Sequence, residues 1–212
     1  MTLDPAAKER PVQRTQPSRM PRDERRAQLL ASALEVFVTH GYHGAAMDEI
    51  AETAKVSKPV LYQHFPSKRE LYLALLDSHL EGLTTMLLAA LSSTTDNNLR
   101  VQATMKAYFQ FMAKDDQAHR LVFESDLVND VEVAARLEKF NANYADAISA
   151  VIAEDTKLPP IEATLLGRAL AGMAQVSARY WLEESGDLDL DVASDLIYRL
   201  AWRGISRFPK ET

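Results

Sequence analysis

The stretch from residue 47 to residue 65 constrains the fold most strongly, because it predicts two short helices joined by a tight turn. Four apolar residues fall at helical spacing and form the inward face of the first helix: Met47, Ile50, Ala51 and Ala54. Ser57 is a favourable N-cap for the second helix, and Pro59 fits only its first turn. Leu61 and Phe65, four residues apart, share its inward face. This pattern is typical of a helix-turn-helix.

Six residues remain on the outward face of the second helix: Lys58, Pro59, Val60, Tyr62, Gln63 and His64. Cations, hydroxyls and amides are the groups that reach phosphates and base edges in the major groove of DNA. We therefore predict that this face binds double-stranded DNA. The amide of Gln63 can pair with adenine and is expected to set sequence preference. Lys58, Tyr62 and His64 are expected to contact mainly phosphates.

The flanking segments predict two further helices beside this motif. Residues 23–40 carry apolar side chains at steps of three and four, and Gly41 supplies a C-terminal stop. Ser67 and Glu70 have the spacing of a capping box, which starts a long helix over residues 68–91. Such a helix can connect the DNA-binding head to the rest of the chain.

Two more DNA contacts are predicted near these helices. Lys68 lies in the first turn of the long helix, where the helix N-terminus adds its own positive end for a phosphate. Tyr42 either belongs to the core or presents its hydroxyl to a phosphate, and the core is the simpler interpretation. The charge distribution agrees with DNA binding: residues 1–69 hold 11 Lys and Arg against 8 Asp and Glu, while residues 70–212 hold 13 against 22.

The remainder of the chain predicts a helical body, with five more helices over residues 101–112, 117–124, 131–153, 161–183 and 190–206. The expected fold class is therefore all-α. Three parts are expected: a disordered basic arm over residues 1–20, the helix-turn-helix domain over residues 21–67, and a helical bundle over residues 68–212. The arm is either a solvated tail without a role or a segment that adds phosphate or minor-groove contacts.

Aromatic and soft side chains concentrate in the middle of the body: Tyr108, Phe109, Met112, Phe123, Phe140 and Tyr144. For each of them, ordinary core packing is the simpler interpretation, because any helical bundle needs such residues. As a group they can also line an apolar cavity for a hydrophobic small molecule. Arg120, at the edge of this region, is the predicted cation for an anionic part of such a ligand.

Several functional classes find no support in the sequence. Cysteine is absent, which excludes disulfides and thiolate chemistry and makes a cytoplasmic location the natural expectation. No apolar run approaches the roughly 18 to 20 residues that a membrane span requires. His40 and His43 are three residues apart, but Gly41 interrupts any helix between them, so no metal site is expected. The sequence has no Gly-rich phosphate loop and no nucleophile elbow, and we expect neither a cofactor nor an enzyme.

The head resembles the N-terminal domain of TetR-type transcriptional regulators. The matching residues are Ala33, Phe37, Gly41-Tyr42, Met47-Asp48, Ile50-Ala51, Ala54, Val56-Ser57-Lys58, Leu61-Tyr62, His64-Phe65, Ser67-Lys68 and Leu71. The chain departs from the family pattern at a few positions. Ala45 and Ala46 replace the usual hydroxyl side chains, Lys55 replaces a common turn Gly, and Pro59-Val60 replaces a common Gly-Thr.

The whole chain is also similar to actinobacterial TetR-type regulators of fatty-acid synthesis. The features that carry this likeness are Asp48-Glu49-Ile50-Ala51, Pro59-Val60-Leu61-Tyr62-Gln63-His64-Phe65, Thr94-Thr95-Asp96-Asn97 and Ala178-Arg179-Tyr180-Trp181-Leu182. The resemblance implies a homodimer on a near-palindromic operator and a long-chain acyl-CoA effector in the body. It also implies that the last two helices form the dimer interface, with contacts at Gly172, Arg179, Trp181 and Trp202; the small residues of 161–183 suit close helix packing.

Two other functions remain open. One is a TetR-type repressor of an efflux pump that senses hydrophobic or cationic drugs. The other is a peripheral membrane or lipid-carrier protein that uses its basic arm against anionic lipid. An operator footprint distinguishes this second function from both types of regulator.

Overall fold

The computed structural model describes residues 20–114, 118–123, 127, 129–184 and 187–204. Over these residues the chain is helical and contains no strand, which confirms the all-α prediction. The predicted arm lies outside the described residues, apart from Met20. The helices are α1 (Arg22–Gly44), α2 (Met47–Thr53), α3 (Lys58–His64), α4 (Lys68–Ser92), α5 (Asn97–Met112), α6 (Ala118–Phe123), α7 (Val131–Asp155), α8 (Pro160–Glu184) and α9 (Leu190–Arg203).

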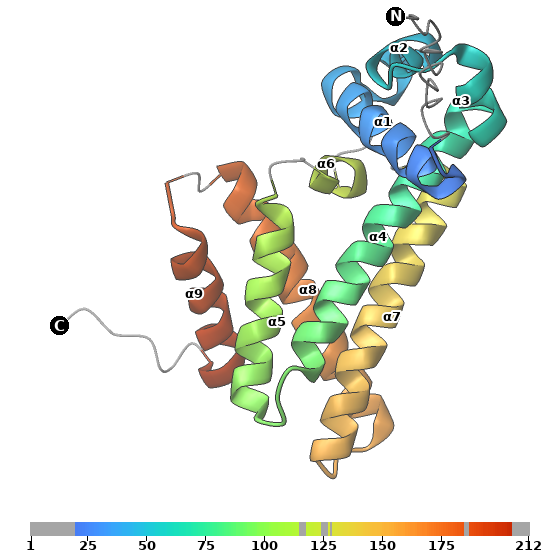
Figure 1. Cartoon of the computed structure of the whole chain (residues 1–212). Coiled ribbons are helices and arrows are strands. Elements are labelled where there is room, and N and C mark those ends of the chain that lie inside the picture. The colour runs from blue at the N-terminus through green and yellow to red at the C-terminus, as the bar shows by residue number, and fades with distance from the viewer. Residues whose placement is uncertain (1–19, 115–117, 124–126, 128, 185–186, 205–212) are drawn as a thin grey trace, which may run out of the picture.

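Helices α1, α2 and α3 form the head at one end of the molecule (Figure 1). Its core contains the apolar residues that the sequence placed inward on α2 and α3: Met47, Ile50, Ala51, Ala54, Leu61 and Phe65. Helix α1 breaks at Gly41, whose φ of 68° lies in the left-handed region that favours glycine. The predicted stop at Gly41 is therefore confirmed, although a last helical turn continues to Gly44.

Helix α4 runs from the head into the body and is 25 residues long (Figure 1). The Ser67 hydroxyl accepts a hydrogen bond from the Glu70 N–H at 3.1 Å, as the capping pattern predicted. Ser57 behaves differently, because it occupies the N-cap position of α3 without a side-chain capping bond. Its backbone carbonyl instead accepts from the N–H groups of Val60 and Leu61.

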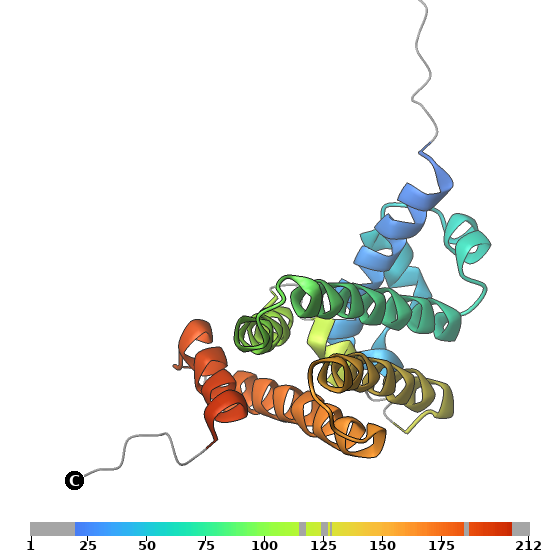
Figure 2. The same cartoon turned by 90° about the horizontal axis from the view of Figure 1, so that it is seen from below.

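The body is a bundle of α4, α5, α7, α8 and α9, which Figure 2 shows from below. Helices α7 and α8 lie closest, because Gly167 of α8 faces Ala145 and Ser149 of α7. A Cβ at position 167 would lie 2.2 Å from the Ser149 hydroxyl and 2.7 Å from the Ala145 carbonyl oxygen. The small residues of α8 at positions 163, 167, 171, 174 and 178 are all buried in this single chain. This side of α8 therefore packs within the subunit.

One helix boundary differs clearly from the sequence prediction. Helix α5 begins at Asn97, four residues before the predicted start, because the Asp96 carboxylate accepts hydrogen bonds from the N–H groups of Asn98 and Leu99. The polar segment before Val101 therefore contains the N-cap and first turn of this helix. Helix α9 ends at Arg203, and residues 205–206 of its predicted span lie outside the described residues.

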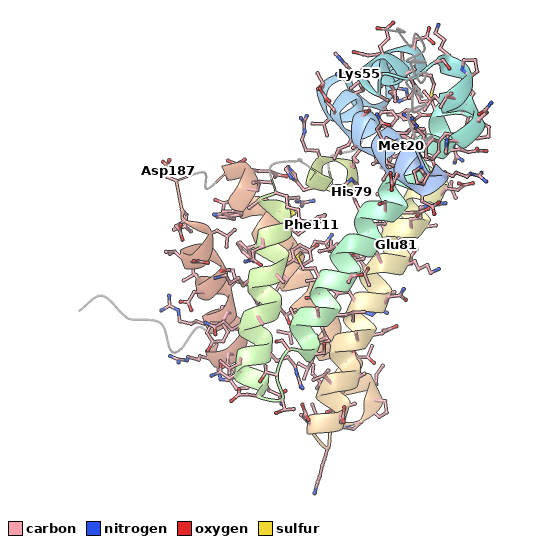
Figure 3. The ribbon with its side chains drawn as sticks, viewed as in Figure 1. Met20, Lys55, His79, Glu81, Phe111 and Asp187 are labelled. Carbon is pink, nitrogen blue, oxygen red and sulfur yellow. The ribbon has the colours of Figure 1, made fainter. Side chains whose placement is uncertain are left out.

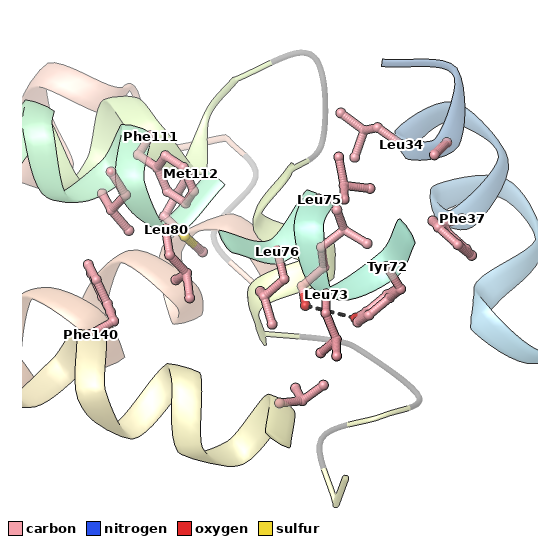
Figure 4. Close-up of a cluster of buried hydrophobic side chains, with 14 of the residues drawn as sticks. Leu34, Phe37, Tyr72, Leu73, Leu75, Leu76, Leu80, Phe111, Met112 and Phe140 are labelled. Atoms are coloured by element: carbon pink, nitrogen blue, oxygen red, sulfur yellow. Dashed lines mark hydrogen bonds between the residues drawn. The ribbon is translucent and has the colours of Figure 1, made fainter. Parts of the chain in front are cut away.

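A continuous apolar core joins the head to the body (Figure 4). Leu34 and Phe37 of α1 meet Tyr72 and Leu75 of α4, and the core continues along α4 to the residues of α5 and α7. Helix α4 is therefore in direct contact with the head through packed side chains. Within the described residues, none of the helices combines the length and the apolar character needed to cross a membrane.

Candidate nucleic-acid interface and effector cavity

The outward face of α3 is available to a partner. Lys58, Pro59, Tyr62 and Gln63 are exposed, with 45% of Tyr62 accessible, whereas Val60 and His64 are partly buried. An exposed tyrosine and amide on a short helix match the chemistry of groove recognition. The predicted DNA-contacting residues of α3 are thus gathered on one side of the head.

The turn before α3 contains a strained residue. Lys55, labelled on the head in Figure 3, lies in this turn. Its φ is 54°, in the left-handed region that is unfavourable for a residue with a side chain. Lys55 stands where the family commonly has Gly, and the backbone explains that preference. Lys55 and Lys58 flank the entry to α3, and the Lys58 ammonium lies 2.6 Å from the Asp48 carboxylate on α2. That ion pair is well exposed, so a phosphate can replace the carboxylate at little cost.

Three arginines of α1 extend the basic surface beyond the residues that the sequence singled out. The charges of Arg22, Arg26 and Arg25 act on His64, whose pKa is lowered first by burial and then by these three cations. The Arg26 guanidinium also lies 4.4 Å from the centre of the Phe65 ring at the end of α3. The start of α1 and the end of α3 therefore form one positive patch. Its signal in the sequence was the run Arg22-Asp23-Glu24-Arg25-Arg26.

Lys68, for which the sequence predicts a phosphate contact, has protein partners in this structure. Its ammonium donates to the backbone carbonyls of Tyr42 at 2.8 Å, Ala45 at 2.9 Å and His43 at 3.3 Å. An ammonium has three N–H donors, so these carbonyls use all of them. The geometry favours a role for Lys68 in holding the loop between α1 and α2 against the start of α4.

Tyr42 packs into the same junction. Its ring stacks on Phe37 at 6.0 Å, meets Tyr72 edge-on at 5.3 Å and lies 4.7 Å from the Lys68 ammonium. The side chain is partly buried, in line with the core interpretation of the sequence. These contacts bind the end of α1 to α4.

The body contains a cavity of about 410 Å³ between the ends of α5, α7, α8 and α9 that lie farthest from the head. Its wall is largely aliphatic and includes Val101, Met105, Ile148 and Leu170. This volume is within the range of small-molecule sites, which are mostly apolar with a few polar groups. The cavity can therefore accept a hydrophobic chain.

Among the aromatic and soft residues predicted to contact a ligand whose side chains are described, Tyr144 alone lines this cavity. Tyr108, Phe109, Met112 and Phe140 are fully buried in the core. The three aromatic rings among them pack against other rings of the body; Phe140 stacks on Tyr144 at 6.4 Å, for example. The sequence located the apolar centre of the body, but periodicity does not show which large side chains leave a gap between them.

The two remaining predicted ligand residues lie elsewhere. Phe123 ends α6, and its side chain lies outside the described part of the structure. Arg120 is exposed on α6, a helix that contacts α1 and α4, and it does not line the 410 Å³ cavity.

One polar end of the cavity carries a cation that the sequence analysis missed. Arg100 is only 15% exposed, and its guanidinium lies 3.0 Å from the Asp155 carboxylate. It also donates to the Asn97 side-chain oxygen at 2.6 Å and to the Thr94 carbonyl at 3.2 Å. The cation is thus held in place by three groups. The sequence did not indicate a ligand-binding role for Arg100, because the apolar pattern that predicts this helix begins at Val101, one residue later.

An unpartnered apolar face runs along α8 and α9. Leu165, Val176 and Tyr180 of α8 are 60–69% exposed, and Val192 and Leu196 of α9 are also exposed. Residues 165, 172, 176 and 180 fall at helical spacing, opposite the buried small residues of α8. Exposed apolar stripes of this kind are typical of subunit interfaces.

The four predicted dimer contacts are divided between this face and the interior. Gly172 is only partly buried and has open space around its Cα, and Arg179 is exposed beside Glu183. Trp181 packs within the subunit: its ring lies 5.4 Å from Phe109, and its indole N–H donates to the Leu188 carbonyl at 2.7 Å. Trp202 is 45% exposed and lines the cavity.

Comparison with known proteins agrees with this architecture. The family model for bacterial regulatory proteins of the tetR family matches residues 29–75, which span most of α1, all of α2 and α3, and the start of α4. The HTH-type transcriptional activator FasR of Mycolicibacterium smegmatis is 46% identical over 192 residues, covering 91% of this chain and 88% of that protein.

Two solved structures share the fold. A TetR-like transcriptional regulator from Rhodococcus sp. RHA1 has a TM-score of 0.72 and 25% identity, covering 90% of this chain and 100% of that chain. The regulator FadR from Bacillus subtilis, in complex with stearoyl-CoA, has a TM-score of 0.68 and 18% identity, covering 84% of this chain and 98% of that chain. With a relative of 46% identity along nearly its whole length, this chain belongs to the tetR family of bacterial regulatory proteins.

Proposed function

We propose that this protein is a cytoplasmic transcriptional regulator that binds a near-palindromic operator as a homodimer and controls fatty-acid synthesis genes in response to long-chain acyl-CoA. The observation that carries the proposal is the exposed face of α3 on a helix-turn-helix head, in a chain 46% identical to the transcriptional activator FasR. No catalytic step or cofactor enters this function. Residues 21–67 act as the DNA-binding domain and residues 68–212 as the ligand-binding and dimerisation domain.

DNA recognition is assigned to α3 and its basic surroundings. Gln63 reads a base edge, while Lys58, Tyr62 and His64 contact phosphates beside the arginines of α1. Support comes from the exposure of Tyr62 and Gln63 and from the exposed Lys58–Asp48 pair, which can exchange its carboxylate for phosphate. Binding of this kind weakens steeply as the salt concentration rises.

The effector is assigned to the cavity between α5, α7, α8 and α9. Its aliphatic wall suits an acyl chain, because each buried methylene stabilises the complex by about 0.8 kcal/mol before ordering costs are deducted. FadR of Bacillus subtilis, which has the same fold, was solved with stearoyl-CoA. Arg100, held beside Asp155 at one end of the cavity, is the nearest cation for an anionic part of the ligand.

A path from this cavity to the head passes through the start of α4. The Arg69 guanidinium lies 3.0 Å from Asp130, the N-cap of α7, and 3.1 Å from Glu132. The adjacent Lys68 holds the loop of the head at Tyr42 and Ala45. A ligand that shifts α7 therefore moves α4 and alters the spacing of the two heads in the dimer.

An operator footprint combined with sedimentation tests the proposal. We expect one dimer to protect two half-sites about 34 Å apart, or a multiple of that distance, which corresponds to turns of the duplex. Operator selection with Gln63→Ala is expected to relax base preference at one position per half-site, whereas Lys58→Ala weakens binding to all sequences alike. Protection of a single half-site by a monomer would contradict the proposal.

The two other functions make different predictions in the same assay. A drug-sensing repressor of an efflux pump would give the same footprint but would be released by cationic dyes and not by acyl-CoA. A peripheral lipid-binding protein would bind anionic vesicles and leave no footprint.

A further inference from the structure

Two tyrosine hydroxyls in the body are buried without a hydrogen-bond partner. Tyr108 of α5 is 1% exposed and Tyr144 of α7 is 4% exposed. Neither hydroxyl has a hydrogen-bond partner among the described residues. The two rings are neighbours, with their centres 6.2 Å apart. Buried polar groups are almost always paired, so an adjacent pair of exceptions calls for an explanation.

Other buried tyrosines of this chain follow the usual rule. The Tyr72 hydroxyl donates to the Leu121 carbonyl at 3.2 Å (Figure 4). The Tyr198 hydroxyl lies 2.5 Å from the Asn98 side-chain oxygen. Tyr108 and Tyr144 therefore differ from these two tyrosines in having no hydrogen-bond partner.

Tyr144 forms part of the cavity wall, and Tyr108 lies behind it without lining the cavity. The other hydroxyls that line it already have partners: Thr104 donates to the Arg100 carbonyl at 2.8 Å, and Thr156 donates to the Ile152 carbonyl at 2.7 Å. Arg100 is paired with Asp155. Among the hydroxyls of the described lining residues, that of Tyr144 is thus the one without a hydrogen-bond partner in the protein.

The chemistry of this donor selects the ligand. Burial raises the pKa of both tyrosine hydroxyls, so each keeps its proton at neutral pH and can donate a hydrogen bond. A donor needs an acceptor oxygen, which a cationic dye lacks at its charged centre. An acyl group has such an oxygen in its carbonyl, attached to a chain that suits the aliphatic wall.

We propose that the Tyr144 hydroxyl, with Tyr108 adjacent to it, donates a hydrogen bond to the acyl carbonyl oxygen of a ligand in this cavity. The inference rests on the proposed function, since it takes the cavity to be the effector site. It adds that the reactive end of the acyl group is recognised inside the bundle by neutral hydroxyls. A thioester and a free carboxyl group share this carbonyl chemistry.

The first test is the stability of the ligand-free protein, obtained after removal of lipids. Tyr144→Phe removes a hydroxyl that has no partner, so its melting temperature is expected to equal or exceed that of the wild type. Tyr72→Phe is the matched control, because it removes a paired hydroxyl and is expected to lower the melting temperature. If Tyr144→Phe lowers it as much as Tyr72→Phe does, the Tyr144 hydroxyl is satisfied within the fold and the inference is wrong.

The second test compares palmitoyl-CoA with S-hexadecyl-CoA, a thioether that has the same chain but lacks the carbonyl. The wild type is expected to bind the thioester roughly five- to tenfold more tightly, which is the effect of one hydrogen bond. Tyr144→Phe is expected to bind both compounds equally, and Tyr108→Phe to reduce the preference in part. Equal binding of the two compounds by the wild type would overturn the inference.

Palmitate, measured in parallel, separates this inference from the proposed function. If palmitate binds in a Tyr144-dependent way and palmitoyl-CoA does not bind, carbonyl recognition stands and the acyl-CoA effector is wrong. If both bind without dependence on Tyr144, the acyl effector stands and carbonyl recognition by this residue is wrong.

Discussion

The ammonium of Lys68 lies 2.8 Å from the carbonyl oxygen of Tyr42 and 4.7 Å from the centre of the Tyr42 ring, so one side chain fixes the end of α1 to the start of α4. Lys68→Met keeps the aliphatic stem and removes the ammonium. We expect it to lower the free energy of unfolding by about 2 kcal/mol, because hydrogen bonds from a charged group are lost and carbonyls are left without partners. Urea denaturation at fixed protein concentration measures this loss.

Lys58→Met is the matched control for this prediction. Its ion pair with Asp48 is exposed, so its removal is expected to change the free energy of unfolding by less than about 1 kcal/mol while it weakens operator binding. If Lys68→Met instead unfolds like the wild type and loses DNA affinity, Lys68 contacts phosphate, as its place at a helix start predicts.

Lys55→Gly is expected to stabilise the head. Lys55 adopts a φ of 54°, which costs about 1 kcal/mol or more for a residue with a Cβ and nothing for glycine. The greater entropy of glycine in the unfolded chain offsets part of this gain. We therefore expect the free energy of unfolding to increase by about 0.5 kcal/mol. Lys55→Ala removes the charge but keeps the Cβ, and an equal gain in that variant would refute the conformational explanation.

Gly167→Ala is expected to lower the free energy of unfolding by about 1–3 kcal/mol, because its Cβ would overlap the Ser149 hydroxyl and the Ala145 carbonyl. A Cβ at Gly82, in the middle of α4, would meet no atom within 4 Å apart from its chain neighbours and the adjacent backbone of its own helix. Gly82→Ala should therefore raise the free energy of unfolding by up to about 1 kcal/mol through helix propensity. Chemical denaturation of both variants decides whether α7 and α8 approach as closely as the structure indicates.

Operator affinity is expected to rise as the pH falls through about 6.5, the ordinary pKa of histidine. Burial and the charges of Arg22, Arg26 and Arg25 lower the pKa of His64 in the free protein. Phosphates next to this ring favour its charged form, so DNA binding raises the pKa of His64 and takes up a proton. At low pH, operator affinity increases about tenfold for each unit by which DNA raises this pKa. The folding stability of the free protein changes in the opposite direction. Because the folded state favours neutral His64, the unfolded chain takes up the proton first, and stability is lost as the pH falls below the ordinary pKa of histidine.

His64→Gln is expected to abolish this pH dependence of DNA binding, since glutamine hydrogen-bonds without titrating. His40→Gln is the control; His40 lies 2.9 Å from Glu49, on a different part of the head. Fluorescence anisotropy on either side of the ordinary histidine pKa measures the slopes, and an unchanged slope in His64→Gln would assign the proton to another group.

The sequence predicted the head well because its structure is local. The face of Met47, Ile50 and Ala51 and the stop at Gly41 depend on neighbours within a few residues. The carbonyl partners of Lys68 could not be predicted, because Tyr42 and Ala45 lie 26 and 23 residues away in the chain. A cation at a helix start looks the same in sequence whether it faces a phosphate or a loop.

The body shows the same limit for a different reason. Aromatic composition located the core around Tyr108 and Phe140, but a cavity is defined by where side chains fail to meet. Arg100 and Asp155, 55 residues apart, come together only through the packing of α5 and α7. Tertiary contacts of this kind leave no periodic signal.

The most direct test of the account is the titration of the operator complex with acyl-CoA of increasing chain length, alongside free CoA and a cationic dye. We predict that long chains reduce operator occupancy at far lower concentration than short ones, and that free CoA and the dye have no effect, because the cavity binds methylenes and an acyl carbonyl. Release by the dye but by no acyl-CoA would contradict the account and assign the protein to the drug-sensing class.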